Sequence, residues 1–286
     1  MRLNFHKMHG CGNDFLFLDY MNMTPPHIYP HEVVFLCDRH YGIGADGLVI
    51  LHQTEGTHAA WKFFNSDGSE AEMCGNAARC AVRFLAEKYY KDDPTISLET
   101  KAGVIKGRML EDGRVEIALM HRGMGNVPLE EKFILFEDKM LQVFLINTGV
   151  PHAVYEVKDI YTYPIERVGK FLSRHEVFHP TGTNVTFFQR LVGPKILSTT
   201  FERGVEKETL ACGTGAAAAA LIYAELYMHN LPIEVNVPGG ELTVDISPVS
   251  KMLLLQGNAE PVMQVEIDKI PHGFEQPRLF TEGKKK

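Results

Sequence analysis

Two cysteines in this chain each stand before a glycine at the expected start of a helix of small residues. One motif is MCGNAARC around Cys74, and the other is ACGTGAAAAA around Cys212. A helix start offers unpaired backbone N–H groups and positive potential, which bind a carboxylate and lower the pKa of a nearby thiol. A glutamate stands four residues before each cysteine, at Glu70 and at Glu208. The repeated design predicts two reactive thiols in one active site.

Two thiols on opposite sides of a bound carboxylate suit inversion at a carbon that carries an acidic hydrogen. One group removes the proton and the other returns a proton from the opposite face. The α-proton beside a carboxylate is only weakly acidic, so two helix N-termini aimed at the carboxyl group would stabilise the developing enolate charge. Because Gly75 and Gly213 have no side chain, they would let a substrate approach the backbone closely.

The other three cysteines are expected to be structural. Free cysteine is often buried as a small apolar residue, and Cys37 lies in the apolar run VVFLC. Cys80, six residues after Cys74, would face away from it on a helix and pack in the core. Cys11 stands in the glycine turn HGCGND, where a structural role is also favoured.

The elements that would position the first motif are read from the periodicity of the apolar residues. Residues 3–20 predict a strand, a glycine-rich turn and a second strand, and residues 31–40 have helical spacing. A long helix is expected to begin near Cys74. Residues 95–120 then alternate apolar and polar side chains between glycine-bearing turns, as a β-meander does.

A similar order of elements follows a break near residues 121–131. Strands lead to a second helix at Cys212, and a hairpin is expected around residues 238–240. This internal duplication predicts an N-terminal half, residues 1–122, and a C-terminal half, residues 123–286, whose last strand could return to the N-terminal half. Two facing halves would bring their helix N-termini to one cleft.

Composition excludes several classes of protein. The chain has 286 residues, of which 45% are hydrophobic, and its net charge of -7 argues against a nucleic-acid or anionic-membrane surface. The N-terminus MRLNFHKMHG lacks the apolar region of a signal peptide, and no apolar run reaches membrane-spanning length. Five cysteines without a CxxC pair favour a reducing compartment and argue against structural zinc. A cytoplasmic protein without a bound metal is therefore expected.

Nucleotide binding is disfavoured by the order of the elements. GIGADG at residues 42–47 matches the pattern GxGxxG, yet it follows an expected helix and precedes a strand, the reverse of the dinucleotide-binding order. CGTGAAAAA lacks the lysine and hydroxyl pair of a phosphate-binding loop. A carboxylate is the better-matched anion, and no cofactor is expected.

With these motifs in place, the chain resembles the diaminopimelate epimerase family over essentially its whole length. Six motifs occur in the family's order: FHKMHGCGNDF, GIGADG, FFNSDGSEAEMCGNAARC, GVPHAV, GTNVTFF and FERGVEKETLACGTGAAA. The family interconverts LL- and meso-diaminopimelate without a cofactor, in bacterial lysine and peptidoglycan precursor synthesis. The resemblance implies an α/β fold of two pseudo-symmetric halves, each a curved mixed sheet around a central helix, with the active site between them. It also implies a homodimer.

The resemblance assigns roles at the two helix starts. It implies that Cys74 and Cys212 form an acid/base pair, one a thiolate while the other is a thiol. It also implies that the backbone of the residues after each cysteine holds the reacting α-carboxylate. These residues are Gly75, Asn76, Gly213 and Thr214.

Further polar residues match the family's positions for tuning the cysteines and binding the substrate. His152 and Glu202 resemble residues that tune cysteine protonation and contact the substrate amine. The set that would read the distal amino-acid end is Asn13, Asn65, Asn184, Glu202 and Arg203. An arginine suits bidentate carboxylate recognition, while carboxylate and amide oxygens accept from an ammonium. In isolation, a turn or helix cap is the better explanation of each asparagine, and a surface ion pair is the better explanation of the arginine.

The chain departs from the family pattern at three places. It has GVPH where many members have GNPH, so Val150 cannot supply that asparagine's contact, and Gly47 stands where some members carry glutamine. FERGVEKETLAC is one residue longer than the common spacing before the cysteine. These two substitutions remove two polar side chains that could contact the distal end of a substrate.

Three alternatives stay open from the sequence. A related racemase that needs no pyridoxal phosphate could act on a monoamino acid such as histidine or glutamate. A noncatalytic amino-acid-binding protein or sensor could keep the fold without exchanging protons. Thiol-disulfide exchange is the weakest alternative, because the two cysteines are not in a CxxC arrangement.

Overall fold

A computed structural model describes residues 2–122 and 129–268, which form eighteen strands and four α-helices. The first series of elements is β1 (Leu3–Gly10), β2 (Asn13–Tyr20), α1 (Pro30–Cys37), β3 (Gly47–His52), β4 (Ala59–Asn65), β5 (Glu70–Ala71), α2 (Gly75–Lys88), β6 (Ile96–Thr100), β7 (Gly103–Met109), β8 (Val115–Arg122) and β9 (Glu130–Phe136). The second series is β10 (Lys139–Asn147), β11 (Pro151–Glu156), α3 (Ile165–Ser173), the 3-10 turn η1 (Glu176–Phe178), β12 (Asn184–Arg190), β13 (Lys195–Glu202), β14 (Lys207–Thr209), α4 (Gly213–Tyr227), β15 (Ile233–Val237), β16 (Gly240–Ile246), β17 (Met252–Gly257) and β18 (Glu260–Ile267).

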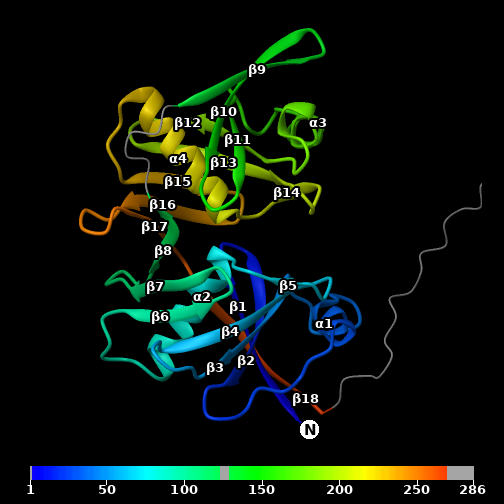
Figure 1. The fold of residues 1–286 in the computed structure, drawn as a ribbon, viewed down its shortest axis with the longest axis vertical. Helices are drawn as coiled ribbons and strands as arrows, with labels where there is room; N and C mark the ends of the chain where they lie inside the picture. The colour runs from blue at the N-terminus through cyan, green and yellow to red at the C-terminus, as the bar shows by residue number, and fades with distance from the viewer. Residues whose placement is uncertain (1, 123–128, 269–286) are drawn as a thin grey trace, which may run out of the picture.

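The same pattern of strand pairing occurs in both series. Neighbouring strands are β1-β2-β3-β4-β6-β7-β8 in the first and β10-β11-β12-β13-β15-β16-β17 in the second. Along each row the pairings run antiparallel, parallel, antiparallel, parallel, antiparallel and antiparallel. The short strand β5 pairs with β4, and β14 pairs with β13. The predicted α/β fold of two pseudo-symmetric halves is confirmed (Figure 1).

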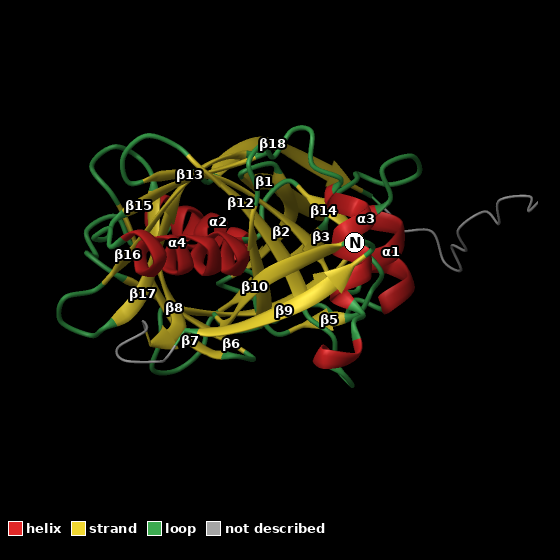
Figure 2. Cartoon of the chain, turned by 90° about the horizontal axis from the view of Figure 1, so that it is seen from above, coloured by secondary structure: helices red, strands yellow, loops and turns green. Residues whose placement is uncertain are grey.

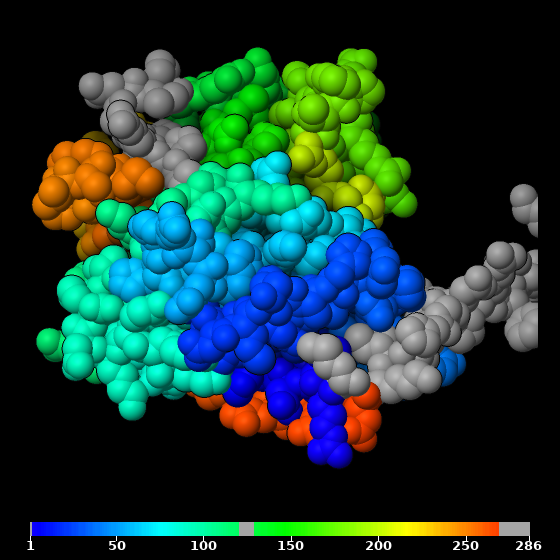
Figure 3. Space-filling model, turned by 60° about the horizontal axis from the view of Figure 1, so that its bottom comes forward, coloured from blue at the N-terminus to red at the C-terminus, as the bar shows by residue number. Residues whose placement is uncertain are grey.

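Strands near the end of each series join the two halves. β8 pairs with β17, and β18 returns to pair antiparallel with β1. β9 pairs in the same way with β10, the first strand of the second series. In Figure 3 the orange-red end of the chain accordingly lies against the C-terminal half at one place and beside the blue N-terminal strand at another. The division at residues 122 and 123 stays a prediction, because the pairings tie both halves into one sheet.

The two central helices are enclosed by strands. Figure 2 shows α2 and α4 lying together inside the ring of strands, with α1 and α3 at the outside. The alanine run from Ala217 to Ala220 in α4 is fully buried, as expected for a helix closely surrounded by other backbone. In the helix the small side chains let strands on several sides approach closely. At Gly215 a Cβ would lie 2.2 Å from the hydroxyl of Thr200, so this position accepts only glycine.

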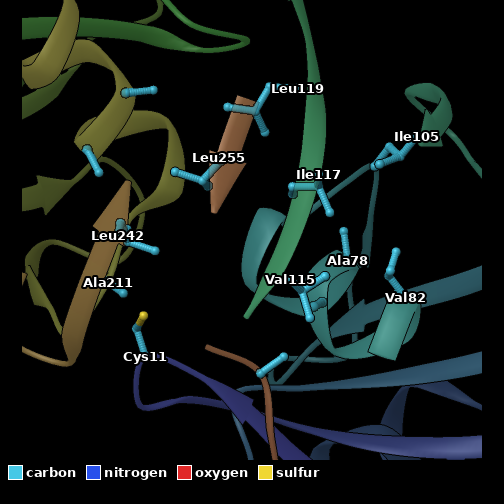
Figure 4. Packing of buried hydrophobic residues seen from close by; sticks show 14 of the residues in the cluster. Cys11, Ala78, Val82, Ile105, Val115, Ile117, Leu119, Ala211, Leu242 and Leu255 are labelled. Atoms are coloured by element: carbon cyan, nitrogen blue, oxygen red, sulfur yellow. The ribbon is translucent and has the colours of Figure 1, made fainter. Parts of the chain in front are cut away.

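One apolar core spans both halves. It contains the first turns of α2 and α4 together with Ile117 and Leu119 of β8 and Leu255 of β17. Figure 4 shows these side chains meeting where the two halves join. Two smaller clusters lie outside it, one beneath α1 and one beneath α3. Cys11 and Cys80 are buried in the large core and Cys37 is buried beneath α1, so all three are packed as expected.

The sequence interpretation missed α3. Its residues Ile165, Val168 and Leu172 are buried in the cluster beneath it, and their spacing is helical. The helix lies where the duplication predicts one, since α1 precedes β3 and α3 precedes β12. Across the two described ranges, no helix has the length and apolar character needed to cross a membrane.

Candidate active site

Cys74 and Cys212 are the N-cap residues of the two central helices. α2 begins at Gly75 and α4 at Gly213, and both cysteines have extended backbones, with φ of -142° and -115°. The Cys212 sulfur also accepts a hydrogen bond from the backbone N–H of Gly215 at 3.4 Å. The predicted helix starts are confirmed, and each thiol lies at the positive end of a helix.

Cys74 lies beside two asparagines. Its Sγ donates to Oδ1 of Asn13 at 3.7 Å, and Nδ2 of Asn76 donates to the same oxygen at 2.9 Å. Nδ2 of Asn76 also donates to the carbonyl of Ala211 at 3.0 Å. Because Ala211 directly precedes Cys212, this contact joins the first turn of α2 to the start of α4 and brings the two cysteine motifs together.

Cys212 is connected to His152 through Thr214. Oγ1 of Thr214 lies 3.4 Å from Sγ of Cys212 and 3.0 Å from Nε2 of His152. Nδ1 of His152 lies 2.9 Å from Oγ1 of Thr186, which lies 3.0 Å from Oγ1 of Thr200. The imidazole is only 1% exposed. Its described contacts therefore reach the thiol through the Thr214 hydroxyl.

Burial raises the pKa of both thiols. At Cys74 the backbone N–H groups of the helix start and the Arg79 guanidinium lower the pKa, but burial outweighs them and Glu202 adds to the increase. At Cys212 burial is again the first cause, followed by the charge of Glu202. The expected effect of the helix starts is present as a contribution. Burial outweighs this contribution, because the desolvation of a thiolate costs more than the helix-start N–H groups stabilise it.

Glu202 lies at the end of β13 and acts on both thiols. Its Oε1 accepts a hydrogen bond from Oγ1 of Thr209 at 2.7 Å. Burial raises the pKa of the Glu202 carboxyl, Thr209 and the nearby Cys212 thiol lower it, and Asp46 raises it further. Since the Glu202 anion also raises the pKa of Cys74, one carboxyl group influences the proton on either sulfur.

The glycines that follow the cysteines face the core. A Cβ at Gly75 would lie 3.6 Å from Leu255 and Ile117, and a Cβ at Gly213 would lie 2.9 Å from Leu255. Figure 4 shows Leu255 between the strand that carries Ile117 and the helix of the C-terminal half. Packing against Leu255 therefore gives a reason for glycine at position 213 that the sequence interpretation did not include.

Three members of the predicted distal set, Asn65, Asn184 and Arg203, are hydrogen-bonded to residues other than the cysteines. Nδ2 of Asn65 donates to Oγ of Ser69 at 3.1 Å, and Oδ1 of Asn184 accepts from the backbone N–H of Arg203 at 2.9 Å. The guanidinium of Arg203 donates to the carbonyl of Gly182 at 3.3 Å. None of these contacts reaches a cysteine, so the part of Asn65, Asn184 and Arg203 in substrate binding stays a prediction.

The repeated glutamates are structural counterparts. Glu70 lies on β5 and Glu208 on β14, the two short strands that occupy equivalent places in the halves. Glu70 forms an ion pair with Lys101 at 2.6 Å, and Glu208 accepts from Oγ1 of Thr199 at 2.6 Å. The partners of both glutamate side chains are therefore residues other than the two cysteines.

Gly47 has a packing reason of its own. A Cβ there would lie 2.6 Å from the carbonyl oxygen of Phe64 on the neighbouring strand β4. A glutamine at this position would require β3 and β4 to move apart. The close approach of β3 and β4 therefore explains why this chain has glycine where some family members have glutamine.

Two residues beside the cysteines were missed from the sequence, Asp46 and Arg79. Oδ2 of Asp46 accepts a hydrogen bond from Nδ2 of Asn13 at 2.7 Å, and Nη2 of Arg79 donates to Oδ1 of Asn76 at 2.8 Å. Both stand in motifs that were read for another purpose, GIGADG and MCGNAARC. The helical spacing between Asn76 and Arg79 was the available signal.

The described residues give little support for a metal or a nucleotide. No group of three His, Cys, Asp or Glu side chains within 2–122 and 129–268 is arranged to hold a metal ion. GIGADG lies between α1 and β3, so it follows a helix and leads into a strand. A cavity of about 740 Å³ lies beside α3, lined by Tyr163, Lys170 and Glu208 among others, and neither Cys74 nor Cys212 lines it.

Replacing His152 with glutamine is expected to reduce the pH dependence of folding stability. Burial lowers the pKa of His152 from 6.5 to about 3. Between these values the unfolded chain takes up a proton and the folded chain does not, so the free energy of unfolding falls as the pH falls from 6.5. At about pH 5 the loss is about 2 kcal/mol for this one group, and it is absent above pH 6.5. Urea unfolding at about pH 7 and about pH 5 measures it.

The matched control for this prediction is His40→Gln, since His40 is exposed. The control is expected to keep the wild-type loss of stability between the two pH values. An equal loss in the His152→Gln variant would contradict a neutral, buried imidazole.

Solved structures with low sequence identity share the fold. A probable proline racemase from Agrobacterium radiobacter K84 superposes with a TM-score of 0.69 at 16% identity, covering 95% of this chain and 94% of that one. A phenazine biosynthesis protein of the PhzF family from Bacillus anthracis superposes with a TM-score of 0.66 at 15% identity, covering 93% and 99%. These similarities establish the two-half architecture and leave the substrate open.

Sequence relatives identify the family. The profile described as diaminopimelate epimerase matches residues 5–127 and 144–262. A protein named diaminopimelate epimerase from Aquifex aeolicus is 39% identical over 274 residues, 92% of this chain and 96% of that protein. One of the same name from Methanococcus maripaludis is 34% identical over 280 residues, 93% of this chain and all of that protein. With both cysteine motifs inside the matched ranges, the chain belongs to the diaminopimelate epimerase family.

Proposed function

We propose that this protein epimerises LL-diaminopimelate to meso-diaminopimelate by a two-cysteine acid/base mechanism without a cofactor. The single observation that carries the proposal is the pair of thiols at the N-caps of two pseudo-symmetric helices, Cys74 and Cys212. One thiolate removes the α-proton from one face of the substrate. The other thiol donates a proton to the opposite face, which inverts the centre.

The groups around the two sulfurs act on both protonation states. Arg79 and two backbone N–H groups act on Cys74 in the direction that stabilises a thiolate. The Thr214 hydroxyl and the backbone N–H of Gly215 act in the same direction on Cys212, and the charge of Glu202 stabilises the thiol at both cysteines. Each sulfur can therefore serve as thiolate or thiol, and the forward and reverse reactions start from opposite arrangements.

The helix starts supply the stabilisation that the reaction needs. The backbone N–H groups of Gly75, Asn76, Gly213 and Thr214 would hold the α-carboxylate, whose carbon acid must become an enolate-like intermediate. Asn13, Asn65, Asn184, Glu202 and Arg203 would bind the rest of the substrate. Arg203 and Glu202 match a distal carboxylate and an ammonium, which favours diaminopimelate over a monoamino acid.

Turnover in deuterium oxide is expected to place deuterium at an α-carbon of diaminopimelate. The measurement is mass spectrometry and chiral chromatography of the products, with LL-diaminopimelate, proline, histidine and glutamate as parallel substrates. We expect exchange and inversion with diaminopimelate and neither with the monoamino acids.

Two results would contradict the proposal in different ways. Faster exchange with a monoamino acid would identify a related racemase. No exchange with any of the four would leave a binding protein that keeps the fold.

Assembly and location are part of the same proposal. We infer a homodimer, as the resemblance to the family implies, and a cytoplasmic location, which the five separate cysteines favour. The hairpin of β9 and β10 offers an apolar surface, because Phe133, Leu135 and Met140 are about three-fifths exposed. Burying such side chains in a second copy would remove apolar area from water.

A further inference from the structure

Two ions lie at the ends of one chain of hydrogen bonds that passes beside Cys74. Nη2 of Arg79 donates to Oδ1 of Asn76 at 2.8 Å, and Nδ2 of Asn76 donates to Oδ1 of Asn13 at 2.9 Å. Nδ2 of Asn13 then donates to Oδ2 of Asp46 at 2.7 Å. Arg79 comes from α2 and Asp46 from the loop before β3, so the chain joins separate segments.

The ions fix the direction of both amides between them. A guanidinium can only donate hydrogen bonds and a carboxylate can only accept them. Arg79 therefore requires the oxygen of Asn76 to face it, and Asp46 requires the nitrogen of Asn13 to face it. As a result Oδ1 of Asn13, and not its NH₂ group, faces Sγ of Cys74 at 3.7 Å.

The same arrangement reaches the second cysteine. Once Arg79 has oriented Asn76, its Nδ2 has two acceptors, Oδ1 of Asn13 and the carbonyl of Ala211 at 3.0 Å. Ala211 precedes Cys212. An Asn76 amide turned the other way would place two carbonyl oxygens against its own oxygen, so the contact between the helix starts depends on Arg79.

The burial of Arg79 indicates a role beyond packing. Its side chain is fully buried, and Nη1 has no hydrogen-bond partner among the described residues. Its remaining contacts are weak, with Nε 3.4 Å from the carbonyl oxygen of Asn258 and Nη2 3.7 Å from Sγ of Cys11. A buried cation with so few partners is costly, and an apolar side chain would fill the space at less cost.

We propose that Arg79 and Asp46 are positioning residues that set the direction of the Asn76 and Asn13 amides, so that the Asn13 oxygen accepts a hydrogen bond from the Cys74 thiol and the two helix starts stay in register. The inference rests on the proposed function only in giving Cys74 a proton to exchange. Charged groups that face Cys74 are Arg79 from its own helix and Glu202 from β13.

The test compares Asp46→Asn and Arg79→Met with matched controls. In Asp46→Asn the new amide can donate as well as accept, so only Asn76 still holds the Asn13 oxygen toward Cys74. The turned Asn13 amide, whose NH₂ group stabilises the thiolate, therefore becomes more populated. Arg79→Met removes the cation and frees Asn76. The controls are Asp112→Asn, in the exposed turn between β7 and β8, and Arg83→Met, one helical turn from Arg79 with its own partner Glu87.

The first readout needs no substrate. The rate of iodoacetamide labelling at the Cys74 peptide is followed by mass spectrometry as a function of pH. We expect the pKa of Cys74 to fall in Asp46→Asn and to rise in Arg79→Met, opposite changes that a general loss of packing would not give. Both controls should match the wild type.

The second readout is turnover of LL-diaminopimelate. We expect kcat to fall by about ten- to a hundredfold in both variants with a smaller change in KM, and Arg79→Lys to recover part of the loss. Asp46 is exposed, so its variant reports on the inference even if Arg79→Met fails to fold. The inference would be overturned if Asp46→Asn had the same pH profile of Cys74 labelling and the same kcat as the wild type. The labelling could change in opposite directions in the two variants while the wild-type protein turns over no diaminopimelate. That result would support the inference and refute the proposed function.

Discussion

Replacing Cys212 with alanine is expected to lower the rate of epimerisation by about two to four orders of magnitude, the usual contribution of a positioned acid or base. The variant keeps Cys74 and the oriented asparagines but has no group that can protonate the second face. Cys74→Ala should lose activity to the same degree, because inversion needs both groups in every turnover. The two losses should not add in the double variant, since either single change already removes inversion.

The measurement is the initial rate of inversion from each stereoisomer, followed by chiral chromatography. Cys80→Ala is the matched control, since it makes the same substitution in α2 at a buried cysteine. A cavity at Cys80 would lower stability, so thermal unfolding of all variants accompanies the kinetics. Full epimerase activity in either Cys74→Ala or Cys212→Ala would refute a two-thiol mechanism.

The helix starts could be predicted because local rules determine them. The glycine and the run of small residues with helical spacing after each cysteine indicated where the two helices begin. The repeated order of strands and helices then predicted two equivalent halves. The match between the two rows of strand pairings has the same origin, since each half must bury one small-residue helix in the same way.

The orientation of the polar groups could not be predicted, because it depends on segments far apart in the chain. Asp46 orients Asn13 from 33 residues away, and Ala211 meets Asn76 from 135 residues away. The net direction of the thiol pKa shifts could not be predicted from the sequence for a related reason. The helix dipole is a local property, whereas burial and the charge of Glu202 come from tertiary packing.

Replacing Glu202 with glutamine is expected to lower kcat by about a hundredfold and to lower the pKa of both thiols. The Glu202 anion raises the pKa of Cys74 and of Cys212 because each thiolate would be a second negative charge beside it. A neutral amide removes that repulsion, so both thiols ionise at lower pH. With both sulfurs ionised, the site has a base on each face and no acid, and turnover falls although each base is stronger.

The pH dependence of kcat and of iodoacetamide labelling measures this effect. The alkaline limb of the kcat profile should move to lower pH in Glu202→Gln, together with the labelling of both cysteine peptides. Glu208→Gln is the control, because Glu208 also accepts a hydrogen bond from a threonine hydroxyl, at 2.6 Å, but points away from the thiols. If both variants moved the profiles equally, the effect would be one of overall charge. A shift confined to Glu202→Gln identifies its carboxylate as the group that keeps one sulfur protonated while the other reacts.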